Sequence, residues 1–123
     1  MSDFQISKNF FYHEFYCQGK EPPGIYKDNI INIATELQKL RSLLNKPIRV
    51  NSGWRCAAHN KLMGGASNSQ HLIGKAADCR IIGFPNNEVG YFACRYTNCN
   101  GIGIGLSYTH LDIRDGNLTI WFY

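Results

Sequence analysis

Two residues of types that bind metal ions lie seven positions apart in the segment Ser69–Asp78. His71 is expected on a loop and Asp78 inside the strand that follows, so that both side chains can converge on one point. Asp78 is flanked by Ala77 and Cys79, an apolar setting in which an unpaired carboxylate is costly. A metal ion removes that cost, because it supplies the compensating positive charge.

His110 is the third candidate ligand, because it lies in a predicted strand between apolar neighbours. Two imidazoles and one carboxylate leave the fourth position of a zinc ion open for water, which is typical of catalytic sites. Zinc lowers the pKa of such a water to ~7 and polarises a scissile carbonyl. The spacing alone leaves simpler interpretations open: hydrogen-bonded histidines beside strands, and an Asp78 that pairs with a nearby arginine such as Arg80.

The elements that must position these residues follow from the spacing of apolar residues. Recurrence at three- and four-residue spacing predicts a helix over 27–44, with Asp28 as its N-cap and Asn45 at its end. A second, shorter helix is predicted over 57–63 and a third over 86–96. The aromatic segment 9–17 is expected to form a short helix or turn.

Strands are predicted over 48–50, 74–82, 101–106, 108–114 and 118–123. The last two are expected to form a hairpin around Asp115–Gly116. Glycines alternate with apolar residues at 101, 103 and 105, which predicts a strand whose glycine face meets another backbone closely. Helices followed by a mainly antiparallel sheet predict an α+β fold.

The composition indicates one globular domain, 1–123, because 123 residues with 44% apolar residues suffice for a single core. The net charge is +4, but the basic residues are scattered, and no signature of nucleic-acid binding is present. No stretch approaches the ~20 apolar residues of a membrane span. The first residues lack the apolar core of a signal peptide, so we expect synthesis in a cytoplasm without an export signal.

Five cysteines cannot pair completely within one chain. Buried free thiols are the expected state, and a single disulfide or a stray thiol ligand is the alternative.

Several blocks of the sequence together resemble the zinc D-alanyl-D-alanine carboxypeptidase family, which includes phage endolysins and shares its fold with hedgehog signalling domains. The blocks come in the family's order, from about Phe10 to Arg114. They are SGWR (52–55), HN (59–60), GGA (64–66), SQHLxGxAAD (69–78) and HLDxR (110–114).

This resemblance implies a single zinc peptidase-like domain in which His71, Asp78 and His110 bind Zn²⁺. It implies that Arg55 contacts the substrate carbonyl or the developing oxyanion, a role suited to its fixed charge and planar donors. It places Ser69 in contact with the substrate peptide or its terminal carboxylate.

The chain departs from the family where many members carry an acidic general base before the last zinc histidine. Ser107, Tyr108 and Thr109 occupy these positions, and no carboxylate lies in the ten residues before His110. Asp112 shares a strand face with His110, so it is a candidate base, or else a residue that orients His110 or pairs with Arg114 or Arg55. Tyr108 is a candidate hydrogen-bond donor to the oxyanion.

The function that the resemblance implies is zinc-dependent hydrolysis of peptide bonds in peptidoglycan stem peptides, as a D,D-carboxypeptidase or an endolysin-type endopeptidase. The alternative is an inactive wall-binding or phage structural module that retains the zinc site. The expected partner is a stem peptide, with no nucleic acid and no membrane span, and the expected form is a monomer. The expected place of action is the bacterial cell wall, with a phage-encoded protein as one source.

Overall fold

The computed structural model describes residues 3–123. Its strands are β1 (Gln5–Ser7), β2 (Phe10–Phe11), β3 (Ile48–Ser52), β4 (Ala76–Ile81), β5 (Gly101–Ile104), β6 (Thr109–Asp112) and β7 (Thr119–Phe122). Its α-helices are α1 (Lys27–Leu44), α2 (Ala57–Leu62) and α3 (Asn86–Tyr96). Short 3-10 helices span Tyr12–Phe15, Gly24–Tyr26 and Gln70–Ile73. The α+β fold predicted from the sequence is confirmed.

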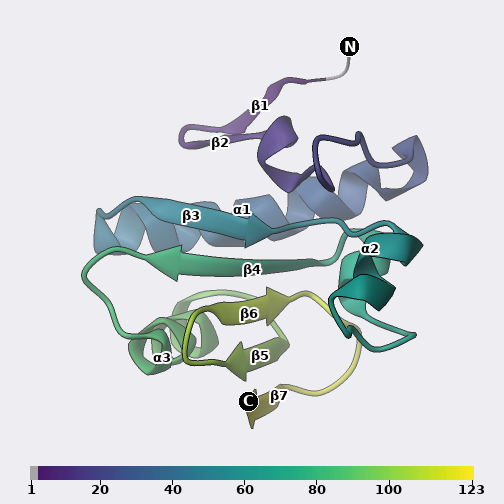
Figure 1. Cartoon of the computed structure of the whole chain (residues 1–123). Helices are drawn as coiled ribbons and strands as arrows, with labels where there is room; N and C mark the ends of the chain where they lie inside the picture. The colour runs from purple at the N-terminus through teal and green to yellow at the C-terminus, as the bar shows by residue number, and fades with distance from the viewer. Residues whose placement is uncertain (1–2) are drawn as a thin grey trace.

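The main sheet has the strand order β3-β4-β6-β5-β7. The first four strands are antiparallel to their neighbours, and β7 runs parallel to β5. Helices α1 and α3 lie behind this sheet in the view of Figure 1, and α2 lies at the end where β3 stops. The small β1–β2 pair lies beyond the β3 edge (Figure 1).

The core lies between the sheet and the two long helices. Most of the helix face predicted for 27–44 is buried there, as Ile30, Ile33 and Leu37 illustrate, each 0% exposed. Every second residue of β4 faces the helices, and Ala77 and Cys79 are 0% exposed. Because side chains alternate along a strand, the intervening residues face away from the helices, and these carry the site described below.

Helices α1 and α3 have the predicted bounds. Asn45 ends α1 in a left-handed conformation, with a φ of 51°, which asparagine adopts more readily than most residues. The N-cap prediction is wrong: Tyr26, two residues before Asp28, is the N-cap, and Asp28 lies inside the first turn of the helix. There the carboxylate of Asp28 complements the partial positive charge of the helix start.

The predicted hairpin around Asp115–Gly116 is wrong. Strand β6 is already paired on both edges, by β4 and by β5, so that β7 can add only at the free edge of β5. The connecting segment is tied to Asn100, whose side-chain amide donates to the carbonyls of Arg114 and Gly116 at 3.1 and 3.3 Å. The backbone N–H of Thr119 donates to the Asn100 carbonyl at 2.7 Å. A turn sequence such as Asp115–Gly116 does not by itself show which strand the segment after the turn will pair with.

The aromatic segment 9–17 forms the expected short helix at Tyr12–Phe15, but it also contributes β2 to a two-stranded ribbon that the sequence did not predict. Phe10, Tyr12 and Phe15 are buried, at 2% exposure or less.

Within residues 3–123, no helix combines the length and the apolar character that a membrane crossing requires.

Candidate metal centre

One cross-strand row of the sheet carries most of the site. Asp78 in β4 lies opposite His110 in β6, His110 lies opposite Gly103 in β5, and Gly103 lies opposite Trp121 in β7. On the other side of Asp78, the row continues to Ser52 in β3. Residues paired in this way have their side chains on the same face of a sheet, so the register alone places Asp78 beside His110.

His71 reaches this row from the short 3-10 helix Gln70–Ile73, just before β4. The Ser69 hydroxyl accepts a hydrogen bond from the His71 backbone N–H at 3.2 Å, and Gly74 ends the helix with a φ of 76°. The side chain of His71 is buried, and its Nδ1 lies 2.7 Å from the Gly53 carbonyl oxygen. A carbonyl only accepts, so Nδ1 carries the proton and Nε2 presents a lone pair to the site.

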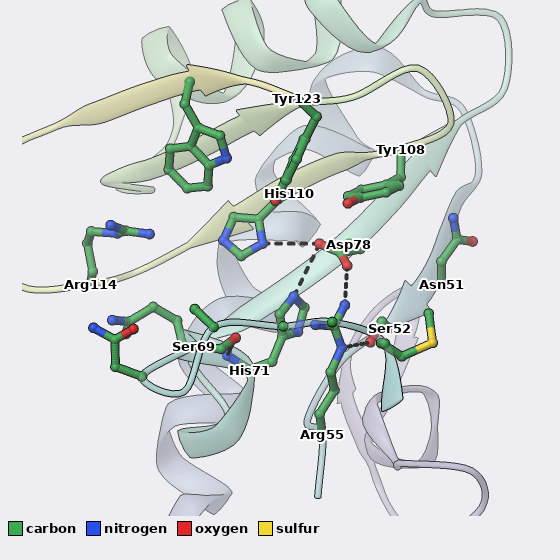
Figure 2. Close-up of a pocket in the computed structure, with 17 residues that line it drawn as sticks. Asn51, Ser52, Arg55, Ser69, His71, Asp78, Tyr108, His110, Arg114 and Tyr123 are labelled. Carbon is green, nitrogen blue, oxygen red and sulfur yellow. Dashed lines mark hydrogen bonds and ion pairs between the residues drawn. The ribbon is translucent and has the colours of Figure 1, made fainter. Parts of the chain in front are cut away.

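The three side chains point their donor atoms at one place (Figure 2). His71 Nε2 lies 3.2 Å from Asp78 Oδ1, and His110 Nδ1 lies 3.1 Å from the same oxygen. His71 Nδ1 and His110 Nε2 each face an acceptor, so in neutral rings these two nitrogens carry the protons. His71 Nε2 and His110 Nδ1 would then direct their lone pairs at the lone pairs of Asp78 Oδ1. A cation between them removes this repulsion. The group holds two imidazoles and one carboxylate, which fits a zinc ion with an open fourth position.

The second oxygen of Asp78 is held by Arg55, in the loop between β3 and α2. Arg55 Nη2 lies 2.7 Å from Asp78 Oδ2, and its Nε donates to the Ser52 hydroxyl at 2.9 Å. Burial opposes ionisation of Asp78, but its contacts with the His110 and His71 rings hold the pKa of this carboxyl well below its usual range. Asp78 therefore stays an anion, with Arg55 rather than Arg80 as its partner.

Asp112 lies on the far side of His110 from Asp78. Its Oδ2 accepts from His110 Nε2 at 2.7 Å, and Arg114 binds the same carboxylate through Nε and Nη2 at 2.9 and 2.7 Å. Burial opposes ionisation, but the hydrogen bonds from Arg114 and His110 hold the pKa of Asp112 well below its usual range. Its side chain is 0% exposed. Asp112 therefore both contacts His110 and pairs with Arg114, which are two of the roles considered for it, and it does not line the cleft described next.

The glycines of β5 make room for side chains rather than for a neighbouring backbone, which corrects the sequence prediction. A Cβ at Gly101 would collide with the Asp112 carboxylate, and one at Gly103 would lie 2.7 Å from the Trp121 indole. At Gly105, directly after β5, the nearest atom is a backbone oxygen, that of Tyr108. The indole of Trp121 thereby crosses Gly103 and packs on His110, with 5.3 Å between ring centroids, and on the Arg114 guanidinium at 5.0 Å.

A cleft of about 720 Å³ opens above the three candidate ligands. In Figure 2, Tyr108 and Tyr123 lie on one side of Asp78, and Ser69 lies on the other. Among the described residues that line the cleft, the carboxylate of Asp78 is the one acid, whereas Arg55 and Arg114 supply two positive charges. Burial raises the pKa of the Tyr108 phenol to about 12, so this hydroxyl is a neutral donor.

The structure therefore brings together all the residues singled out from the sequence. His71, Asp78 and His110 form the centre, and Arg55, Ser69 and Tyr108 line the cleft above it. Asp112 lies behind the centre and is absent from the cleft lining.

The sequence reasoning missed Trp121, Tyr123 and the carbonyl of Gly53. A signal for the first two was present: aromatic residues at alternate positions of the last strand match the glycines at alternate positions of β5. No local pattern indicates the Gly53 carbonyl, because its contact with His71 depends on the fold.

Comparisons with known proteins agree with this geometry. Residues 8–113 match the sequence profile of the Peptidase M15 family. The zinc D-Ala-D-Ala carboxypeptidase of Streptomyces albus G is 38% identical over 77 residues, which cover 57% of this chain and 30% of that protein. The chain thus spans under a third of the length of this curated relative. Because the profile covers most of the chain, including every residue of the His71–Asp78–His110 centre, the protein belongs to the Peptidase M15 family.

Proposed function

We propose that this protein is a zinc-dependent peptidase that hydrolyses peptide bonds in bacterial peptidoglycan stem peptides. The observation that carries the proposal is the convergence of His71, Asp78 and His110, within 4.8 Å of one another, on the floor of an open cleft. The name of the Streptomyces relative, a D-Ala-D-Ala carboxypeptidase, supports a stem peptide as the substrate. We further propose that the protein acts at the cell wall as a monomer.

Zinc held by His71, Asp78 and His110 would supply Lewis-acid polarisation of the scissile carbonyl and acidification of a water molecule. The chain's own contribution begins with orientation. The Gly53 carbonyl fixes the tautomer of His71, and Asp112 fixes that of His110. Such outer partners keep each ring turned toward the metal and increase its basicity.

Arg55 has a double role in this proposal. Its Nη2 neutralises the outer oxygen of Asp78, while the guanidinium lines the cleft and presents a fixed positive charge to a substrate carbonyl. Tyr108 lines the same cleft and stays protonated, so it can donate to the oxygen on which negative charge develops. We also propose that Ser69, which lines the cleft, contacts the substrate chain; its hydroxyl accepts from the His71 backbone N–H.

A second candidate function is supported by the acid content of the cleft. Among the described lining residues, the one carboxylate is Asp78, which is itself a ligand candidate and is paired with Arg55. Hydrolysis by a zinc peptidase needs a group that accepts a proton from water, and Asp112 faces away from the cleft. A wall-binding or phage structural module that keeps the zinc site but lacks turnover explains this absence directly.

One experiment separates the two functions. Purified muropeptides are incubated with the zinc-loaded protein, with the protein after chelation, and with a His110→Ala variant, and the products are identified by mass spectrometry. Cleavage that is lost in the last two samples supports the peptidase. If the protein co-sediments with intact walls but cleaves nothing, even with protein and substrate in equal amounts, the result would support the binding module instead.

A second experiment distinguishes a D,D-carboxypeptidase from an endopeptidase. We favour a D,D-carboxypeptidase, because the Arg55 and Arg114 guanidinium groups line the cleft and their planar donors suit a terminal carboxylate. A blocked peptide that ends in D-Ala-D-Ala should then be cut faster with a free C-terminus than with an amidated one. Equal rates on both peptides would indicate an endolysin-type endopeptidase instead.

A further inference from the structure

Two cysteines that are distant in the sequence meet beside the site. Cys17 follows the N-terminal 3-10 helix, and Cys56 follows Arg55 directly. Their sulfur atoms lie 3.7 Å apart, and the Cys56 backbone N–H donates to Cys17 Sγ at 3.3 Å. A disulfide needs a sulfur separation of about 2.04 Å, so the two atoms must approach by ~1.7 Å.

The backbone on both sides holds these sulfurs together. The Trp54 N–H donates to the Phe15 carbonyl at 3.0 Å. Gly53 packs so closely on Phe15 that an added Cβ would lie 2.6 Å from the Phe15 Cα. Cys17 is further fixed by its backbone pairing with Lys20. The pair is therefore built by two packed segments and not by one flexible loop.

The two thiols differ in their access to a reagent. Cys56 is half-buried, and a hydrogen bond from the His59 backbone N–H and one with Cys17 lower the pKa of its thiol. Cys17 is 3% exposed, and burial raises the pKa of its thiol. Thiolates are the nucleophiles in disulfide exchange, so Cys56 reacts first and Cys17 follows.

We propose that Cys17 and Cys56 are a modification site that a small-molecule disulfide converts into an intramolecular disulfide. The Cys56 thiolate attacks one sulfur of the reagent, forms a mixed disulfide and releases one thiolate. Cys17 then loses its proton and attacks the Cys56 sulfur, which forms the protein disulfide and releases the second thiolate. Two protein thiols are oxidised, and one reagent disulfide is reduced to two thiols.

The cross-link would restrain the turn 53–56, which positions residues of the site. It is a property of the protein that goes beyond the proposed function. The turn from Gly53 to Cys56 contains Arg55 and the carbonyl that orients His71. A bond between Cys17 and Cys56 closes a loop of 39 residues. Such a closure restricts the unfolded chain and fastens this turn to the N-terminal segment. The proposal concerns the thiols alone and stands whether or not the protein cleaves peptides.

The test is oxidation of the folded, zinc-loaded chain with oxidised glutathione. We expect two fewer titratable thiols than the five of the reduced chain, a mass lower by two hydrogen atoms, and a peptide map that joins Cys17 to Cys56. The melting temperature should rise by about 10 °C, and a reductant should reverse the shift.

Matched variants make the test specific. Cys94→Ser removes an exposed cysteine and should leave both the cross-link and the shift intact. Cys56→Ser should abolish both. Cys17→Ala, at the buried cysteine, should also abolish both and serves as the test if Cys56→Ser folds poorly. Five thiols that are still titratable when the oxidised wild type is unfolded, a map that joins another pair, or a cross-link that persists in Cys56→Ser would each overturn the proposal.

Discussion

The two faces of strands β4 and β6 are buried to a similar extent by opposite means. On the helix side, Cys79 and Leu111 are 0% exposed against apolar neighbours. On the cleft side, Asp78 and His110 are 5% and 6% exposed, and Asp112 is 0% exposed. The first face is covered by α1 and α3 (Figure 1), and the second by Arg55, Arg114 and Trp121.

The difference shows how one pair of strands can serve two purposes. Apolar burial on the helix side stabilises the fold. Burial of carboxylates is favourable only when each is paired or bound to a metal, so the cleft side depends on the two arginines and on the cation. Variants on adjacent residues should therefore separate folding stability from metal binding.

The largest expected effect comes from the neighbours His110 and Leu111. His110→Ala should abolish stoichiometric zinc binding, because two donors remain. Leu111→Ala should keep the zinc but lower the free energy of unfolding by about 2–5 kcal/mol, because it leaves a cavity in the core. Elemental analysis and denaturant unfolding of both variants measure the two quantities. Wild-type zinc content in His110→Ala would remove this residue from the centre.

The next effect concerns the orienting carboxylate. Asp112→Asn should weaken zinc binding by about 10- to 100-fold, because His110 loses a charged partner. Competition with a coloured chelator measures the affinity. Asp115→Asn is the matched control, since the Asp115 side chain is 98% exposed and should change nothing. Unaltered zinc affinity together with lost turnover would restore the general-base role of Asp112.

A smaller effect is expected from the cleft hydroxyl. Tyr108→Phe should lower kcat by about tenfold without altering zinc affinity, because it removes one donor to the developing charge. Burial holds the phenol pKa at about 12, so the hydroxyl stays protonated and the loss should be equal at neutral and mildly alkaline pH. Tyr91→Phe, at a residue that is 59% exposed, is the control. A kcat equal to that of wild type would exclude Tyr108 from the reaction.

The smallest effect compares two neighbours on β7. Trp121→Ala should weaken zinc binding by about two- to fivefold, because the cation–π contact that steadies Arg114 is worth about 0.5–1 kcal/mol. Phe122→Ala should leave the affinity unchanged, since Phe122 is 73% exposed and absent from the cleft. Equal affinities for the two variants would show that the indole does not support the centre.

The sequence predicted what depends on local spacing. The bounds of α1 and α3 follow from apolar periodicity, and the three ligand candidates follow from residue types within specific blocks. The placement of β7, the contact between Gly53 and His71, and the meeting of Cys17 with Cys56 were not predicted, because each depends on which distant segments pack together. The role of Asp112 required its actual partners, since two residues on one strand face can point to the same ligand or away from it.

The cross-strand row from Ser52 to Trp121 also has a consequence for the order of events during folding. Its members are spread over 70 positions of the chain (from 52 to 121), and β6 must dock on β4 before His110 meets Asp78. Pairings between distant segments form slowly, because the intervening chain must first be closed into a loop. A nascent chain that ends before β6 cannot assemble all three donors. Zinc capture is therefore a late event, and the bound ion reports that β6 has docked on β4.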